Sequence, residues 1–236
     1  MTDKKQDTTN APASNQSLNK LRAAVLGAND GIVSTSAVLM GVAGATNNTG
    51  AIFTAGLAAL VAGALSMAVG EYVSVSSQSD AEKAFIEKER TLLRTDPEGQ
   101  LESLVQHYVD QGIHETTARE VAVELTKTDA LKAHLMAQFG MEEDDVVNPT
   151  HAAVASLLSF TVGGLIPFIT ILAAPVNIRI WATGFAVLLA LCATGYLSAK
   201  AGNASRRRAI LRVVIGGVLA MVITFFVGRL FGTSIA

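Results

Sequence analysis

The chain has 236 residues, of which 50% are hydrophobic and 20 are glycines, and its net charge is −2. This composition is more apolar than that of an ordinary soluble domain and favours a protein in contact with lipid, while the absence of a basic excess gives no reason to expect a nucleic-acid partner. The single cysteine, Cys192, excludes a disulfide framework or a cysteine-based metal site within one chain, and we interpret it as a small core residue.

The N-terminal part predicts a tail followed by a helical hairpin. Residues 1–18 are polar and lack the apolar run of a signal peptide, so we expect a disordered cytoplasmic tail. Two apolar segments follow, from Leu21 to Ala45 and from Ala51 to Ser77, with turn-prone residues 46–50 between them. Both exceed the ~20 residues that a helix needs to cross the hydrocarbon core. We therefore expect two transmembrane helices within residues 19–79.

Residues 80–148 change character. They are rich in charge, and their apolar residues recur at spacings of three and four, as in Leu101, Leu104, Val105 and Tyr108. This pattern predicts three or four amphipathic helices outside the membrane. Turn chemistry places breaks near residues 95–97, at Gly112 and at residues 148–149.

Residues 149–236 return to apolar runs, from Ala152 to Ala174, from Ile180 to Ala199 and from about Ile210 to Phe231. The predicted fold is therefore an all-α polytopic membrane protein, with five transmembrane helices and a helical insert between the second and the third.

Lysine and arginine predict the orientation. With the N-terminus inside, every basic residue except Arg179 and Arg229 falls on or beside the cytoplasmic side. We therefore expect the insert to be cytoplasmic and the C-terminus to be external.

Asp30 lies within the first predicted span, where a carboxylate costs several kcal/mol unless it faces a polar cavity, a cation or a partner. The alternative is a helix N-cap, because Asp-Gly is also turn-like. Residues 21–26 already resemble the start of a helix, which favours a functional Asp30.

Met67 and Glu71 lie four residues apart on the second span and share a face. At ~1.5 Å per residue, Asp30 and Met67 come out about 14 and 15 Å from the same membrane side. Two carboxylates and a thioether would make a mixed oxygen and sulfur site that suits iron(II). The alternatives are a packing role for Met67 and an interfacial carboxylate for Glu71.

Glycines are dense in these helices. Gly56, Gly63 and Gly70 repeat every seven residues and predict close packing of the second span on another helix. The stretch 163–167, GGLIP, predicts either a broken helix ladder that exposes carbonyl groups or a packing kink.

Three phrases carry a family resemblance: residues 27–35 (GANDGIVST), residues 64–78 (ALSMAVGEYVSVSSQ), and Asn148-Pro149 followed by GGLIP. With the order of spans, they resemble the vacuolar iron transporter family over nearly the whole chain after residue 18, as a bacterial-type member. The resemblance implies a homodimer that exchanges cytoplasmic iron(II) or manganese(II) for protons, with Asp30 and Met67 as metal ligands and Glu71 as a nearby carboxylate.

The resemblance is weaker in the insert. Iron-storing members carry paired glutamates there that collect metal. Glu89, Glu98 and Glu102 are candidate ligands in this chain, whereas Leu92, Gln100, Ser103 and Gln138 stand where further glutamates would be expected. Glu142, Glu143, Asp144 and Asp145 form another acidic group, although such charges usually only face solvent. The histidines, His107, His114, His134 and His151, show no metal-ligand spacing.

The sequence thus predicts a transporter of divalent iron or manganese, without a resident cofactor, in a bilayer that we expect to be a bacterial inner membrane. A membrane-anchored sensor or scaffold and a passive cation channel are the alternatives. No motif of an enzyme is visible.

Overall fold

The computed structural model describes residues 15–143, 146–202 and 204–235. The predicted tail lies outside the described residues as far as residue 14, and the first helix begins at Asn15. The described residues form helices and no strands.

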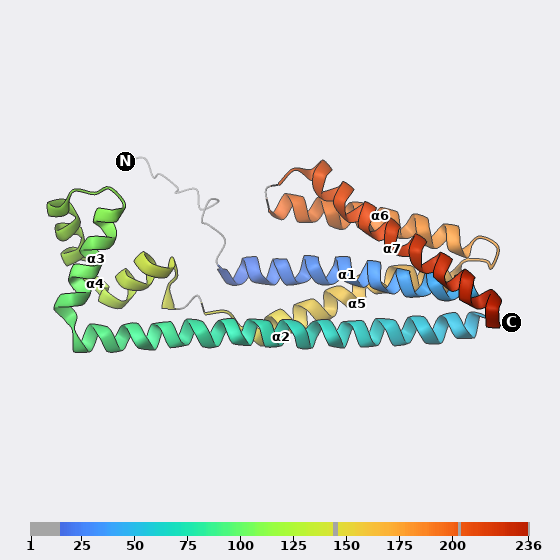
Figure 1. Cartoon of the computed structure of the whole chain (residues 1–236), viewed down its shortest axis with the longest axis horizontal. Helices are drawn as coiled ribbons and strands as arrows, with labels where there is room; N and C mark the ends of the chain where they lie inside the picture. Colours follow the sequence, from blue (N-terminus) through green and yellow to red (C-terminus); the bar gives the residue numbers. More distant parts are fainter. Residues whose placement is uncertain (1–14, 144–145, 203, 236) are drawn as a thin grey trace, which may run out of the picture. The chain divides into compact units, whose positions relative to one another are not determined.

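Seven helices follow one another in the part of the chain that the structure describes (Figure 1). They are α1 (Asn15–Ala45), α2 (Thr49–Thr95), α3 (Pro97–Asp110), α4 (Glu115–Phe139), α5 (Pro149–Ala173), α6 (Arg179–Ala201) and α7 (Arg206–Ile235). Among the described residues, α1, α2, α5, α6 and α7 are long and apolar enough to cross a membrane. The predicted all-α class with five candidate spans is confirmed.

The chain divides into two compact units. Val75–Asn148 belongs to the first, which we call the insert unit, and Ser17–Ser74 with Pro149–Ala236 forms the second, which we call the transmembrane unit. The boundary falls inside α2.

Helix α2 is longer than predicted. The prediction ended it near Ser77, but it continues to Thr95. The reason is that no glycine or proline occurs between Glu71 and Thr95, so a change from apolar to charged residues does not stop the helix. Pro97 disfavours helical geometry in the residue before it and begins α3, and the Asp96 side chain accepts a hydrogen bond from the Gly99 amide at 3.0 Å.

Glycines bring the helices of the transmembrane unit into close contact. A Cβ on Gly31 of α1 would lie 2.1 Å from the Phe160 carbonyl oxygen of α5, and a Cβ on Gly228 of α7 would lie 1.8 Å from the Gly41 carbonyl oxygen of α1. Because side chains larger than hydrogen do not fit at these points, α1 packs with its backbone directly against both α5 and α7.

The predicted glycine repeat of α2 is used in part. A Cβ on Gly56 would meet Leu39 and Phe168, and a Cβ on Gly63 would meet Phe160, so both glycines pack on neighbouring helices. Gly70 has open space around its Cβ position. Helix α5 runs on through Pro167, and the two glycines of GGLIP pack closely against α1.

In the insert unit, α3 and α4 pack around Leu104, Val105, Ala118, Ala122 and Ala133. The break at Gly112 occurs where predicted, with a positive φ of 91°. Helix α4 contains a kink that the sequence pattern did not predict: Asp129 has extended backbone angles, and its side chain accepts a hydrogen bond from the Lys132 amide at 2.9 Å. The kink therefore restarts the helix with an N-cap of its own.

Candidate metal site

The contact between α1 and α5 fixes the direction of Asp30. Gly27 and Gly31 are one turn apart and both face α5, where a Cβ on Gly27 would lie 2.8 Å from the Ser156 carbonyl oxygen. Asp30 precedes Gly31 and is thereby turned away from the centre of this contact. Its side chain is half-buried and lies in a recess toward α2.

Ser34 holds the Asp30 carboxylate in place. Its hydroxyl donates a hydrogen bond to Asp30 Oδ1 at 2.6 Å, and the two residues are one helical turn apart. Hydrogen bonds to an ionised acceptor are the short and strong ones. One oxygen is thus oriented by the helix itself, and the second can serve a cation.

Asp30, Met67 and Glu71 line one recess of about 400 Å³ in the transmembrane unit. Met67 and Glu71 come from α2 and occupy one face of it, as their spacing predicts. Met67 also packs on a small core cluster around Leu60, Ala64 and Phe160. The structure therefore brings together the three residues that the sequence placed at similar depth.

Two hydroxyl groups and two glycines complete the recess. Ser34 and Ser66 add oxygen atoms, and Gly63 and Gly70 leave room between the larger side chains. The prediction did not include either serine. The available signal for Ser34 was its position four residues after Asp30, on the same helical face.

The donor set of the recess can bind a divalent transition metal. Carboxylate and hydroxyl oxygens suit hard cations, and the thioether of Met67 adds preference for softer ones such as iron(II). A cation near Asp30 would also offset the cost of placing a carboxylate in a membrane span.

The glutamates predicted as ligands in the insert lie in different surroundings. Glu98 is exposed on α3. Glu102 is also exposed and accepts two hydrogen bonds from the Arg119 guanidinium, at 2.7 and 2.9 Å. Glu89 is only 4% exposed, and its Oε1 lies 2.9 Å from Nδ1 of the buried His134.

His134 was not singled out by the sequence. Burial lowers its pKa, and the neighbouring Glu89 carboxylate acts in the opposite direction without overcoming the effect. The imidazole is therefore neutral at neutral pH, and the pair joins α2 to α4 as a buried polar contact.

The two described members of the acidic group at residues 142–145 have basic partners. Glu142 pairs with Lys132 at 3.0 Å, and Glu143 pairs with Arg90. Asp144 and Asp145 lie outside the described residues. In the ranges that the structure describes, no three histidine, cysteine or acidic side chains gather closely enough to hold a metal ion. The assignment of Glu89, Glu98 and Glu102 as ligands stays a prediction.

The profile of the VIT family matches residues 21–229, which include α2 to α6 and most of α1 and α7. The chain belongs to the VIT family. A vacuolar iron transporter of Acanthamoeba castellanii is 44% identical over 213 residues, covering 89% of this chain and 78% of the relative. Vacuolar iron transporter homolog 1 of rice is 37% identical, covering 90% and 74%, and homolog 3 of Arabidopsis thaliana is 36% identical, covering 90% and 84%.

VIT-family membership and the five candidate spans identify an integral membrane protein. Its relatives carry the names of transporters, which agrees with the prediction that this VIT-family chain is not an enzyme.

Proposed function

We propose that the chain transports divalent iron, and also manganese, across a membrane, and that Asp30, Met67 and Glu71 bind the ion on its way. The observation that carries this proposal is the recess itself, which two carboxylates and a thioether from two candidate spans line together. The relative from Acanthamoeba castellanii is named as a vacuolar iron transporter, which supports the choice of metal.

The proposed mechanism is exchange of the metal for protons. A carboxylate that releases a divalent cation inside a membrane is left charged, and a proton removes that charge at low cost. Asp30 and Glu71 would therefore take up protons as the metal leaves, and the ion would reach the recess from the cytoplasm by alternating access. Ser34 keeps Asp30 oriented in both states, because its hydroxyl can donate to the ionised carboxylate or accept from the protonated one.

A homodimer is part of the proposal. The rim of the recess includes Leu26 and Val38, which are 51% and 40% exposed. Leu57, Val61, Leu65 and Val69 continue an exposed apolar stripe along α2. A second copy on this face would shield the carboxylates from lipid. Disulfide crosslinking of Val61→Cys in a Cys192→Ser background tests this arrangement.

The orientation and the membrane are also part of the proposal. The distribution of basic residues supports a cytoplasmic N-terminus, and the short loops between the spans are compatible with a bacterial inner membrane. The relatives carry names that refer to a vacuole. Fractionation of the source cell distinguishes the two membranes.

The deciding experiment compares the wild-type chain with Asp30→Asn in proteoliposomes that contain a pH-sensitive dye. For the wild type, we expect iron(II) or manganese(II) to enter the vesicles while protons move in the opposite direction. For Asp30→Asn, we expect the metal flux to be at least ten-fold lower, while the protein still elutes as a folded species. Asp80→Asn is the matched control, because Asp80 is exposed in the insert unit.

The other outcomes contradict specific parts of the proposal. Metal entry without proton movement means a channel, and undiminished flux in Asp30→Asn removes Asp30 from the pathway. No metal entry in the wild type favours a sensor or scaffold.

A further inference from the structure

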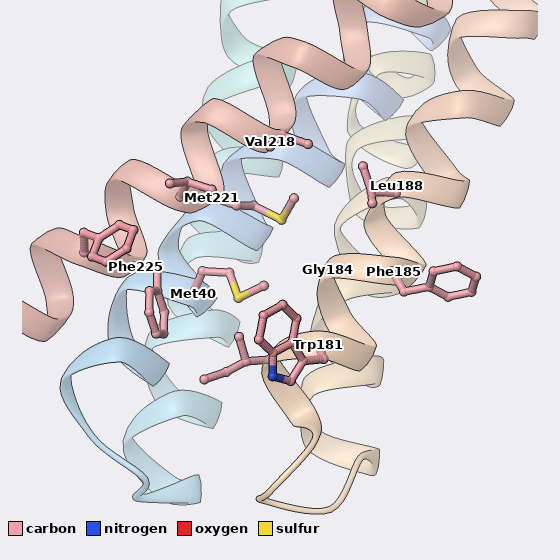
Figure 2. A pocket seen from close by; sticks show the side chains of 11 residues that line it. Met40, Trp181, Gly184, Phe185, Leu188, Val218, Met221 and Phe225 are labelled. Carbon is pink, nitrogen blue, oxygen red and sulfur yellow. The ribbon is translucent and has the colours of Figure 1, made fainter.

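A second hollow in the transmembrane unit has an entirely different lining. It is a groove of about 670 Å³ between α6 and α7, with Met40 of α1 at its back (Figure 2). Trp181, Gly184 and Leu188 of α6 face Val218 and Met221 of α7 across it. No acidic side chain contributes to this lining, so the groove offers no carboxylate ligand to a metal ion.

The groove is open to the bilayer. Both of its walls are candidate membrane spans, so hydrocarbon is the medium that adjoins it. An apolar hollow without contents loses the dispersion contacts of its lining. Its volume also falls within the ~300–1,000 Å³ that is typical of ligand sites in proteins. An acyl chain fits such a space in shape and in chemistry.

One end of the groove lies where α6 begins and α7 ends. Helices α6 and α7 run antiparallel, since Gly195 packs on Ile210 while Leu191 packs on Gly217, so the start of α6 and the end of α7 lie together. At this end stands Trp181, which is 81% exposed. Tryptophan prefers the membrane interface, where its ring contacts lipid and its N–H meets polar groups.

Arg229 continues the groove face of α7 toward the same end. It follows Phe225 and Phe226, which line the groove, by four and three residues, and therefore lies one helical turn further on the same face. A guanidinium group presents five N–H donors and binds phosphate in two-point fashion. Apolar walls that end in a tryptophan and an arginine match a molecule with a long chain and a phosphate.

We propose that the groove between α6 and α7 binds one phospholipid, from the leaflet at the α6 N-terminus. An acyl chain lies between the two helices above Met40, and the phosphate lies at Trp181 and Arg229. The groove and the metal recess share no lining residue.

Trp181 makes the proposal testable in the unaltered protein, because it is the only tryptophan in the chain. The full chain is reconstituted with a dibrominated phospholipid, dissolved in mild detergent and separated from free lipid by gel filtration. Bromine quenches tryptophan fluorescence on contact. A retained lipid leaves Trp181 at least twofold dimmer than in a sample with the unbrominated lipid. Equal fluorescence in the two samples overturns the proposal.

A pair of glycine variants tests the place of binding. A Cβ on Gly184 would meet only the Met40 methyl group, at 3.7 Å, so Gly184→Leu fills the groove without a backbone clash. Gly216→Leu is the matched control, because Gly216 is exposed on α7 outside the groove and its Cβ position is open. Phospholipid phosphorus per purified chain is expected to fall at least twofold in Gly184→Leu and to stay at the wild-type level in Gly216→Leu. Equal phosphorus in all three proteins overturns the site.

Two further readouts complete the test. Arg229→Gln is expected to lower retained phosphorus at least twofold, and unchanged retention overturns the headgroup position. A different outcome is that the wild type retains no lipid and that the Gly184→Leu variant has a lower oligomeric mass than the wild type in light scattering. In that case a second copy of the chain occupies the groove, and the lipid proposal is wrong.

Discussion

The two units use carboxylates in opposite ways. In the transmembrane unit, Asp30 and Glu71 are half-buried around a recess that also holds a thioether. In the insert unit, the candidate glutamates are either exposed, like Glu98 and the Arg119-paired Glu102, or buried against an imidazole, like Glu89. Arg119 supplies a counter-charge to Glu102, whereas Asp30 and Glu71 line a recess where a divalent cation would offset the cost of placing carboxylates in a membrane span. The surroundings, more than the number of acidic residues, therefore separate the two units.

The sharpest test of this comparison exchanges one glutamate in each unit. Glu71→Gln is expected to reduce metal flux in proteoliposomes at least ten-fold, because it removes a charge from the recess that must hold a divalent cation. Glu102→Gln is expected to stay within about twofold of the wild type, since its charge is engaged by Arg119 at the surface. The reverse ranking would place the rate-limiting metal contact in the insert unit.

A second prediction concerns the packing that orients Asp30. Gly31→Ala would bring a methyl group to 2.1 Å from the Phe160 carbonyl oxygen, so the two backbones must separate. Overpacking of this kind costs about 1–3 kcal/mol or more, and the thermal midpoint in detergent should fall clearly. Gly70→Ala is the matched control, because its Cβ position is open and alanine favours the helix. Equal midpoints for the two variants would mean that α1 and α5 are not in backbone contact.

The buried pair of the insert unit predicts a pH effect. The lowered pKa of His134 means that the folded chain binds fewer protons than the unfolded chain at pH values below the ordinary imidazole pKa of about 6.5. Stability is therefore full above about pH 6.5 and decreases as the pH falls toward the lowered pKa. Calorimetry of the full chain at pH 7.5 and 5.5 measures this loss. His134→Gln, which cannot titrate, should show a smaller difference between the two pH values. An equal difference would assign the pH effect to other groups.

Much of the fold could be predicted because it depends on local properties of the sequence. Apolar runs of sufficient length marked the five candidate spans, and turn chemistry marked the breaks at Pro97, Gly112 and Pro149. The end of α2 could not be predicted from hydropathy, because the helix stops at a proline and not where the apolar residues end. The kink at Asp129 has no glycine or proline signal and depends on a side-chain cap.

The residues of the candidate site could also be grouped from local properties of the sequence. Helical spacing joined Met67 to Glu71, and the depth estimate matched them with Asp30. The direction of Asp30 depends on the contact of Gly27 and Gly31 with α5, which is distant in sequence. The pairing of Glu89 with His134 also joins two helices that are separated in the chain, so no local sequence pattern predicts it.

The smallest effect is expected at the surface of the insert unit. Arg119 and Glu102 are 47% and 58% exposed, so solvent screens their ion pair and its contribution is about 0–1 kcal/mol. Arg119→Ala should therefore shift the unfolding transition of the insert unit little, and high salt should remove most of that shift. The same variant frees the Glu102 carboxylate beside Glu98. Calorimetry then compares manganese(II) binding by the full-length Arg119→Ala variant and by the wild type. If the variant binds more tightly, and if Glu71→Gln still lowers metal flux, basic partners are what keep the glutamates of the insert unit from collecting metal. Unchanged binding would show instead that the exposed glutamates are too far apart to share an ion, whatever their partners.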